Sequence, residues 1–239
     1  QAEVAALNVE HTEEFFHYAT PAIKAVKEGL DNRVPLIGFA GSPWTLLCYM
    51  VQGQGSKDFG EAKRFILNEP ERAKIMLEKI TEATIRYLHI QIDAGCDAVQ
   101  IFDSWGGMLS PTMYDEFSLP YMTRITEAVK DRVPVILFAK GAWYALDKLH
   151  ATGASALGLS WTTPPDHARK ICGPDAVFQG NLDPTTLLAS PDVVARATKK
   201  MIDSFGGCRH IVNLGHGVLP NTTVDSARAF VETAKAYRY

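Results

Sequence analysis

Ile211-Val212-Asn213-Leu214-Gly215-His216-Gly217 is the stretch of sequence that decides the fold. A short apolar, β-branched run that ends in Gly-His-Gly predicts a buried strand with an imidazole at its C-terminal end. The flanking glycines let ligand and backbone approach closely. Parallel α/β folds carry their chemistry at this end of the strands. For the motif in isolation, a structural histidine at a strand end remains the alternative.

Five other apolar runs repeat this pattern, and several end with a polar or aromatic residue beside a glycine. The six predicted strands span residues 34–40, 97–102, 134–140, 156–161, 176–181 and 210–214. Short strands that alternate with helices indicate a parallel sheet with right-handed crossovers. No G-x-G-x-x-G follows any strand, and polar residues stand at nearly every C-terminal end. The pattern therefore favours a (β/α)8 TIM-type barrel with one pocket at its mouth over an open doubly wound sheet.

Eight strands close such a barrel, and the sequence predicts six. The first residue is Gln1, and a helical pattern is already present from Glu10. We therefore expect residues 1–239 to form a single barrel domain that lacks its N-terminal portion.

Helical periodicity and capping residues predict the segments between the strands. Ser42 can cap a helix whose first residue is Pro43. Pro21 is expected to kink or restart the first helix after Thr20. The predicted helices span residues 11–30, 44–51, 70–94, 111–131, 142–152, 166–171, 191–204 and 225–237.

Composition excludes several classes of partner. The net charge of -3 comes from 24 Lys and Arg against 27 Asp and Glu without a block of like charge, so neither nucleic acid nor an anionic membrane is an expected partner. No apolar run reaches the roughly 18 residues of a membrane span, and no signal peptide is visible, so we expect a cytoplasmic protein. The four cysteines are Cys48, Cys96, Cys172 and Cys208. Their wide spacing favours reduced thiols over disulfides or a zinc site.

Five motifs together carry a resemblance to a known family. They are G-F-A-G-S-P-W-T-L at 38–46, F-D-S at 102–104, F-A-K at 138–140, Q-G-N-L-D-P at 179–184 and N-L-G-H-G at 213–217. In this order and combination they resemble the uroporphyrinogen decarboxylases, from about Phe16 to the C-terminus. Each motif alone is weak, whereas the set is highly specific.

The resemblance implies a distorted (β/α)8 barrel that works as a homodimer without metal or organic cofactor. The implied reaction converts the four acetate side chains of uroporphyrinogen III to methyls, giving coproporphyrinogen III and CO2. Tyr49, Ser104 and His216 match family residues that contact substrate, and Tyr49 and His216 are the expected catalytic residues. The family's R-Q-A-G-R-Y stretch and the aspartate of F-S-D-I-L have no counterpart in this sequence. We therefore expect little decarboxylation from these 239 residues alone.

The chemistry of the residues agrees with such a substrate. An octacarboxylate needs several hydrogen-bond donors, which the hydroxyls of Tyr49 and Ser104 and the imidazole of His216 can supply. The predicted contacts with the macrocycle come from Phe39, Gly41 and Phe102. Purely structural roles remain as alternatives. Tyr49 could be a core aromatic residue, Ser104 a helix cap, and the two phenylalanines part of the barrel core.

Two residues beside these motifs have other expected roles. Lys140 could attract carboxylates. Asp103 is expected to support or cap its neighbours rather than act as an acid catalyst, because another anion would repel the substrate.

Two other functions remain open. A zinc-dependent corrinoid or thiol methyltransferase of the same superfamily would carry His-x-Cys at a strand end, where this sequence has Phe138-Ala139-Lys140. An inactive porphyrin-binding fragment is the non-enzymatic alternative.

Overall fold

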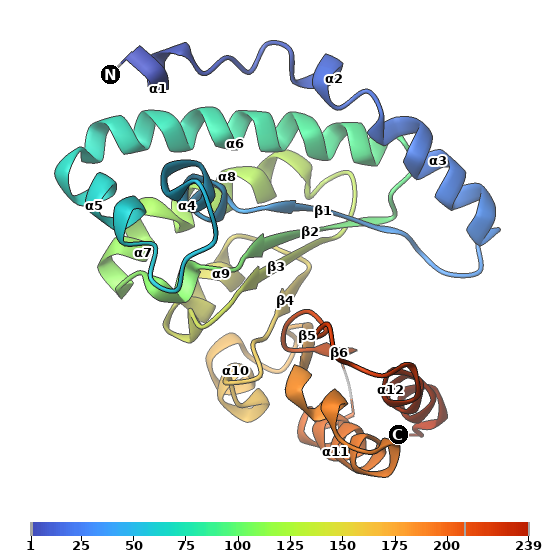
Figure 1. Cartoon of the computed structure of the whole chain (residues 1–239). Coiled ribbons are helices and arrows are strands. Elements are labelled where there is room, and N and C mark those ends of the chain that lie inside the picture. The colour runs from blue at the N-terminus through green and yellow to red at the C-terminus, as the bar shows by residue number, and fades with distance from the viewer. Residues whose placement is uncertain (1, 208, 239) are drawn as a thin grey trace.

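Six parallel strands form one sheet in the computed structural model, which describes residues 2–207 and 209–238. The strands are β1 (Ile37–Gly41), β2 (Ala98–Asp103), β3 (Val135–Ala139), β4 (Ala156–Gly158), β5 (Phe178–Leu182) and β6 (His210–Leu214). Each strand pairs in parallel with the next one along the chain, and helices connect them (Figure 1). The predicted TIM-barrel-like α/β fold is confirmed. The expected lack of an N-terminal portion stays a prediction.

Helices occupy every crossover between these strands, and others precede β1 and follow β6. The helices are α1 (Ala2–Ala6), α2 (Thr12–Phe15), α3 (Ala19–Leu30), α4 (Pro43–Gln52), α5 (Gly60–Asn68), α6 (Pro70–Asp93), α7 (Pro111–Phe117), α8 (Leu119–Val129), α9 (Leu146–Ala151), α10 (Pro165–Cys172), α11 (Pro191–Ser204) and α12 (Val224–Ala236). Three short 3₁₀ segments cover Gly106–Met108, Trp143–Ala145 and Pro184–Leu188. Among the residues described, no helix is both long and apolar enough to cross a membrane.

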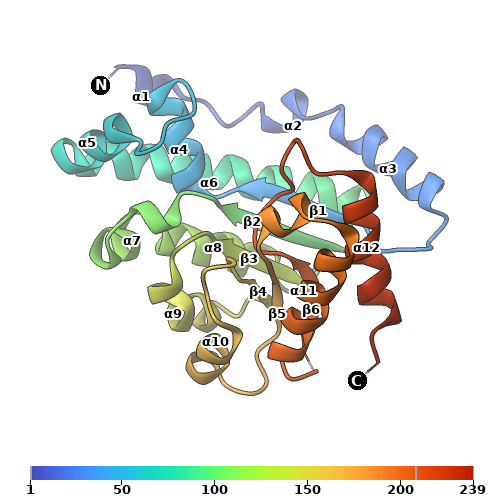
Figure 2. The same ribbon diagram turned by 60° about the horizontal axis from the view of Figure 1, so that its bottom comes forward.

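The outer face of the sheet carries the main core. The strands curve from β1 to β6, and α6, α8, α9 and α11 pack along the outer side (Figure 1, Figure 2). Every second strand side chain points into this layer, so Val99, Ile101, Leu137 and Phe178 are almost fully buried. Burying one such side chain stabilises the fold by about 1.5–3 kcal/mol.

The inner face of the sheet is built from the alternate residues. By the strand register it carries Phe39, Gln100, Phe102, Phe138, Gly158, Gln179 and Ile211. Gln179 Nε2 donates to Gln100 Oε1 across this face at 3.1 Å. Phe39 and Ile211, at the two edges, are 60% and 41% exposed. Three phenylalanines therefore lie on a face that the helices do not cover.

Two predicted helices differ from the structure near prolines. The helix predicted over 111–131 is two helices, because the chain breaks at Ser118 and Pro120 lies in the first turn of α8. A proline there lacks an N–H that would be unpaired in any case. The helix predicted over 11–30 is interrupted after Phe15 and restarts at Ala19, two residues earlier than expected, so Pro21 lies in the first turn of α3. The helix α5 was not predicted, and the residue before it, Phe59, has a left-handed φ of 48°.

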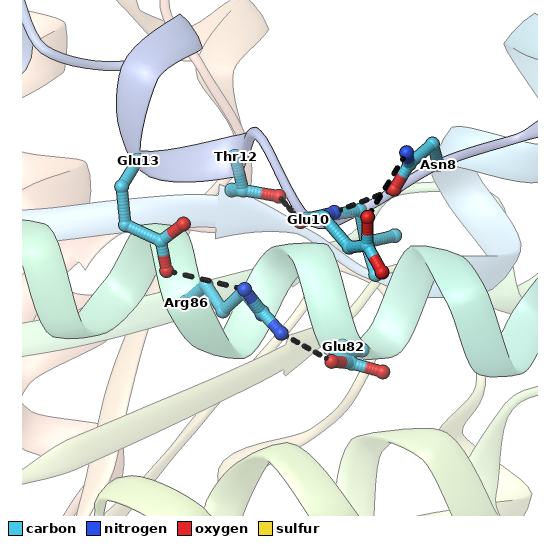
Figure 3. A network of polar contacts seen from close by, with 7 residues as sticks. Asn8, Glu10, Thr12, Glu13, Glu82 and Arg86 are labelled. Atoms are coloured by element: carbon cyan, nitrogen blue, oxygen red, sulfur yellow. Dashed lines mark hydrogen bonds and ion pairs between the residues drawn. The ribbon is translucent and has the colours of Figure 1, made fainter.

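The N-terminal segment lies along α6. Arg86 on α6 bonds Glu82 at 2.8 Å and reaches Glu13 in α2 at 3.5 Å (Figure 3). Lys79 Nζ donates to three backbone carbonyls within residues 4–7, at 2.7–3.1 Å. An apolar cavity of about 370 Å³ lies between this segment, α6 and the edge strand β1. These contacts attach the N-terminal residues to the helix that supports β1 and β2.

Candidate active site

A ladder of aromatic rings crosses the inner face of the sheet. The ring centroids of Phe39 and Phe102 are 6.1 Å apart, and those of Phe102 and Phe138 are 5.9 Å apart, both edge to face. His216 then stacks on Phe138 at 5.8 Å with an interplanar angle of 14°. The ladder therefore runs from β1 across β2 and β3 to the turn after β6. Its accessible part lies at the β1 end, where Phe39 is 60% exposed, whereas Phe138 is buried against the imidazole at the other end.

The Gly-His-Gly turn owes its position to Gly215. The Gly215 N–H donates to the Leu182 carbonyl at 2.8 Å. A Cβ at this residue would lie 2.3 Å from the backbone nitrogen of Trp161, so no side chain fits. Nothing lies within 4 Å of a Cβ at Gly217. The first glycine is therefore required for packing, which brings His216 beside both Phe138 and Trp161.

His216 is neutral near pH 7. Burial lowers the pKa of its imidazole below the usual 6.5, and the nearby Lys140 ammonium lowers the pKa further. A neutral imidazole has one N–H donor and one acceptor nitrogen. His216 can therefore donate to a substrate carboxylate, and an anion beside it would favour its protonated form.

Tyr49 lies on the solvent side of α4 rather than in the core. Ser42 caps this helix by accepting from the Thr45 N–H at 3.0 Å, as the sequence predicted. The tyrosine is 42% exposed, and its ring meets those of Phe59 and Trp105 edge to face at 5.4 and 6.3 Å. The core-aromatic alternative therefore does not hold, and the tyrosine remains accessible to a ligand.

Ser104 stands in the turn directly after β2 and is half-buried. Within residues 2–207 and 209–238 its hydroxyl forms no hydrogen bond, and the 3₁₀ segment that follows has Trp105 at its N-cap position without a side-chain cap bond. The capping alternative is therefore not supported. Its hydroxyl is free to bind a ligand at the C-terminal end of β2.

Tyr49 and His216 are linked through three intermediate side chains. Lys140 Nζ lies 5.4 Å from the ring centroid of Trp105 and 5.6 Å from that of Trp161. Trp105 in turn meets Tyr49, and Trp161 lies 6.4 Å from His216. This chain of contacts joins the ends of β2, β3 and β4 to α4 and to the turn after β6. Sequence reasoning missed both tryptophans.

Asp103 lies beneath this surface, on the outer face of the sheet. It is completely buried and accepts hydrogen bonds from Ser118 at 2.6 Å, Ser42 at 2.7 Å and Thr45 at 3.1 Å. Burial raises the pKa of its carboxyl group, and the three hydroxyl donors oppose that shift. A Cβ at Gly106 would lie 2.6 Å from Asp103 Oδ2. Asp103 thus joins the start of α4 to the end of β2, in the supporting role expected from the sequence.

The remaining predicted contacts lie toward the β1 edge. Phe39 and Gly41 share the inner face with Phe102 and also line the apolar cavity beside α6. Tyr49, Ser104 and His216 do not line that cavity. The structure thus places the predicted macrocycle contacts between two surfaces, the aromatic ladder and this cavity.

No metal-binding cluster is present in the part of the chain that the structure describes, where no three His, Cys, Asp or Glu side chains lie close enough to share an ion. Cys48, Cys96 and Cys172 are free thiols, and burial raises the pKa of each, in Cys172 to about 11. Cys208 lies outside the described residues. The prediction about all four cysteines therefore stays a prediction.

The chain has a TIM-barrel-like fold, and its candidate active site lies at the C-terminal ends of the strands, where enzymes of this fold carry their active sites. Comparison of sequences identifies the family. The sequence model described as "Uroporphyrinogen decarboxylase (URO-D)" matches residues 1–237, and the chain belongs to this family.

Curated relatives of the chain carry the same name. "Uroporphyrinogen decarboxylase" of Christiangramia forsetii is 53% identical over 221 residues, which are 92% of this chain and 65% of that protein. The protein of that name from Flavobacterium johnsoniae is 50% identical over 99% of this chain and 69% of its own length. The one from Schizosaccharomyces pombe is 45% identical over 92% and 64%. The chain therefore spans about two thirds of the length of these relatives.

Solved structures with similar folds are more distant in sequence. A methyltransferase from Methanosarcina mazei superposes with a TM-score of 0.79 at 20% identity, over 91% of this chain and 63% of that one. A B12-independent methionine synthase from Shewanella sp. W3-18-1 has a TM-score of 0.62 at 13% identity, over 90% and 66%. At these identities the likeness shows the shared fold alone.

Proposed function

We propose that this chain carries the active site of a uroporphyrinogen decarboxylase, which converts uroporphyrinogen III to coproporphyrinogen III and four molecules of CO2. The observation that carries the proposal is the aromatic ladder that ends in a neutral His216. Its rings match the apolar faces of the pyrroles in a macrocycle, and its polar end matches the carboxylates at the rim. The names of the curated relatives support the same reaction.

Each decarboxylation replaces a carboxylate by a proton. Protonation of the pyrrole ring creates an electron sink, the bond between the methylene and the carboxylate carbon breaks, and its electron pair moves into the ring as CO2 leaves. The methylene carbon then takes a proton to become a methyl group, and the ring proton is released. The net change consumes one proton per acetate, and no oxidant or reductant is required.

The side chains described above supply what these steps need. Phe39, Gly41 and Phe102 contact the macrocycle, and Ser104 binds a carboxylate. Tyr49 and His216 bind carboxylates and hold protons near the reacting carbons, because a hydroxyl and an imidazole both donate. The apolar rings lower the solvation of the acetate that reacts, which favours loss of its charge.

Assembly and location belong to the same proposal. The resemblance to the family supports a homodimer, and the wide spacing of the cysteines, which favours reduced thiols, supports a cytoplasmic location. Size-exclusion chromatography with light scattering tests the dimer.

An anaerobic assay of the full-length protein with uroporphyrinogen III tests the reaction. Chromatography of the oxidised products separates porphyrins by their number of carboxylates, and we expect the eight-carboxylate substrate to give way to the four-carboxylate product. Binding without any loss of carboxylates would instead support the porphyrin-binding alternative. Transfer of a methyl group to a thiol, together with stoichiometric zinc, would support the methyltransferase.

A further inference from the structure

Lys140 is held at the mouth of the sheet by aromatic faces rather than by an acid. Its ammonium group lies over Trp105 on one side and over Trp161 on the other, at 5.4 and 5.6 Å from the ring centroids. Two indoles orient a cation without neutralising its charge. The two rings therefore hold the ammonium group of Lys140 in a defined place.

The backbone around Lys140 is fixed as firmly as its side chain. Its N–H donates to the Asp103 carbonyl at 3.0 Å, and its own carbonyl accepts from the Gly107 N–H at 2.9 Å. A Cβ at Gly107 would lie 2.6 Å from that carbonyl oxygen, so the glycine allows this approach. The end of β3 is thus attached to the turn after β2, and the lysine cannot move far from the mouth.

No carboxylate within the described ranges, 2–207 and 209–238, lies within ion-pair distance of Lys140. The nearest acid along the neighbouring strand, Asp103, is enclosed on the outer face by three hydroxyl donors. The other titratable group beside the lysine is His216, whose pKa the ammonium lowers. A half-buried cation flanked by aromatic rings and a neutral imidazole points to an anionic ligand.

We propose that Lys140, oriented by Trp105 and Trp161, binds a carboxylate that the substrate keeps, that is, a propionate rather than a reacting acetate. This inference rests on the proposed function. An ion pair with a lysine stabilises a carboxylate in its charged ground state, whereas decarboxylation requires that charge to be lost. A lysine on the reacting acetate would therefore slow the reaction, but on a propionate it positions the macrocycle and leaves the reaction free.

Binding of two stable porphyrins tests this assignment. Uroporphyrin III carries four acetates and four propionates, whereas coproporphyrin III carries four propionates only. Quenching of tryptophan fluorescence in the full-length protein gives the Kd of each. The Lys140→Met variant removes the charge and keeps most of the apolar stem, and Lys140→Arg keeps the charge.

Lys24→Met is the matched control. It removes a charge from the exposed face of α3. Lys24 lies one turn before Lys27, which bonds Asp97 at the end of the sheet opposite to Lys140.

We expect Lys140→Met to raise the Kd of both porphyrins by a similar factor, about tenfold to a hundredfold, as for the loss of a hydrogen bond to a charged group. Lys140→Arg should retain most of the affinity, and Lys24→Met all of it. Coproporphyrin tetramethyl ester, which has no charge, should show no dependence on Lys140. The Kd of the unmodified protein should also rise with salt more steeply than that of Lys140→Met.

Three results would overturn the inference. The first is that Lys140→Met loses affinity for uroporphyrin but not for coproporphyrin, which would place the lysine on an acetate. The second is equal losses in Lys140→Met and Lys140→Arg with an unchanged unfolding midpoint, which would show that shape rather than charge matters. The third is a Kd that does not depend on Lys140, or no binding of either porphyrin by the unmodified protein.

The same experiments separate this inference from the proposed function. If the protein releases CO2 and Lys140→Met binds both porphyrins normally, the inference fails alone. If both porphyrins bind through Lys140 but uroporphyrinogen is never decarboxylated, the proposed function fails alone.

Discussion

Replacing Gly215 by alanine should displace His216 without removing any functional group. The new Cβ would lie 2.3 Å from the Trp161 backbone nitrogen and 2.8 Å from its Cα, where ordinary contact begins at 3.4 Å. Neither backbone atom can rotate away as a flexible side chain could. The turn after β6 must therefore move by about 1 Å relative to the end of β4, because overpacked backbone relaxes by shifting.

The size of the effect follows from that displacement. Overpacking of this kind costs about 1–3 kcal/mol of folding stability. A misplacement of about 1 Å in a catalytic group can cost about a hundredfold in rate. His216 would lose its stacking on Phe138, so we expect kcat/KM to fall about a hundredfold while the protein still folds.

Gly217→Ala is the control on the other side of the same histidine. Nothing lies within 4 Å of a Cβ there, so its activity should stay within about twofold of the unmodified protein. Both variants would be made in the full-length protein and assayed with uroporphyrinogen III, and their unfolding would be followed by circular dichroism. Near-normal activity of Gly215→Ala, or equal losses in the two variants, would refute the view that the contact with Trp161 places His216.

Three further outcomes follow from other residues. His216→Asn should lower kcat/KM by a factor equivalent to about 1.5–3 kcal/mol of transition-state stabilisation, without abolishing turnover. His150 is exposed, and His150→Asn should change nothing measurable in the same assay. Asp103→Ala should lose about 3 kcal/mol or more of unfolding free energy in urea, because three buried hydroxyls lose their acceptor, and Asp103→Asn should lose less. Burial lowers the pKa of His210 below 6.5, so the unfolded state binds more protons than the folded state once the pH falls through 6.5. The free energy of unfolding should therefore keep its full value above that pH and decline below it. The decline should be smaller in His210→Phe.

Strand positions and their C-terminal polar residues could be predicted from the sequence. The runs around Ile101, Leu137 and Val212 have lengths and flanking glycines typical of buried strands, and all three lie in strands. The cap at Ser42 was predictable because serine followed by proline is a strong local signal. Strand positions and helix caps depend on residues close together in the chain, so a single sequence is enough to predict them.

Contacts between distant segments could not be predicted in this way. Trp105 and Trp161 follow different strands, and only the parallel pairing of β2, β3 and β4 brings both to Lys140. The burial of Asp103 had a weak signal, since it follows Phe102 and must face the opposite side of the strand. Nothing in the local sequence shows that Ser118, fifteen residues further on, donates to it.

The position of bound product tests the account most directly. A crystal structure of the full-length protein with coproporphyrinogen III should place the macrocycle against Phe39 and Phe102 on the inner face of the sheet. The donor atoms of Tyr49, Ser104 and His216 should then lie about 2.7–3.2 Å from product carboxylates or from the positions that the lost acetates occupied. A macrocycle seated elsewhere, such as the apolar cavity beside α6, with His216 more than one side chain away, would contradict the account.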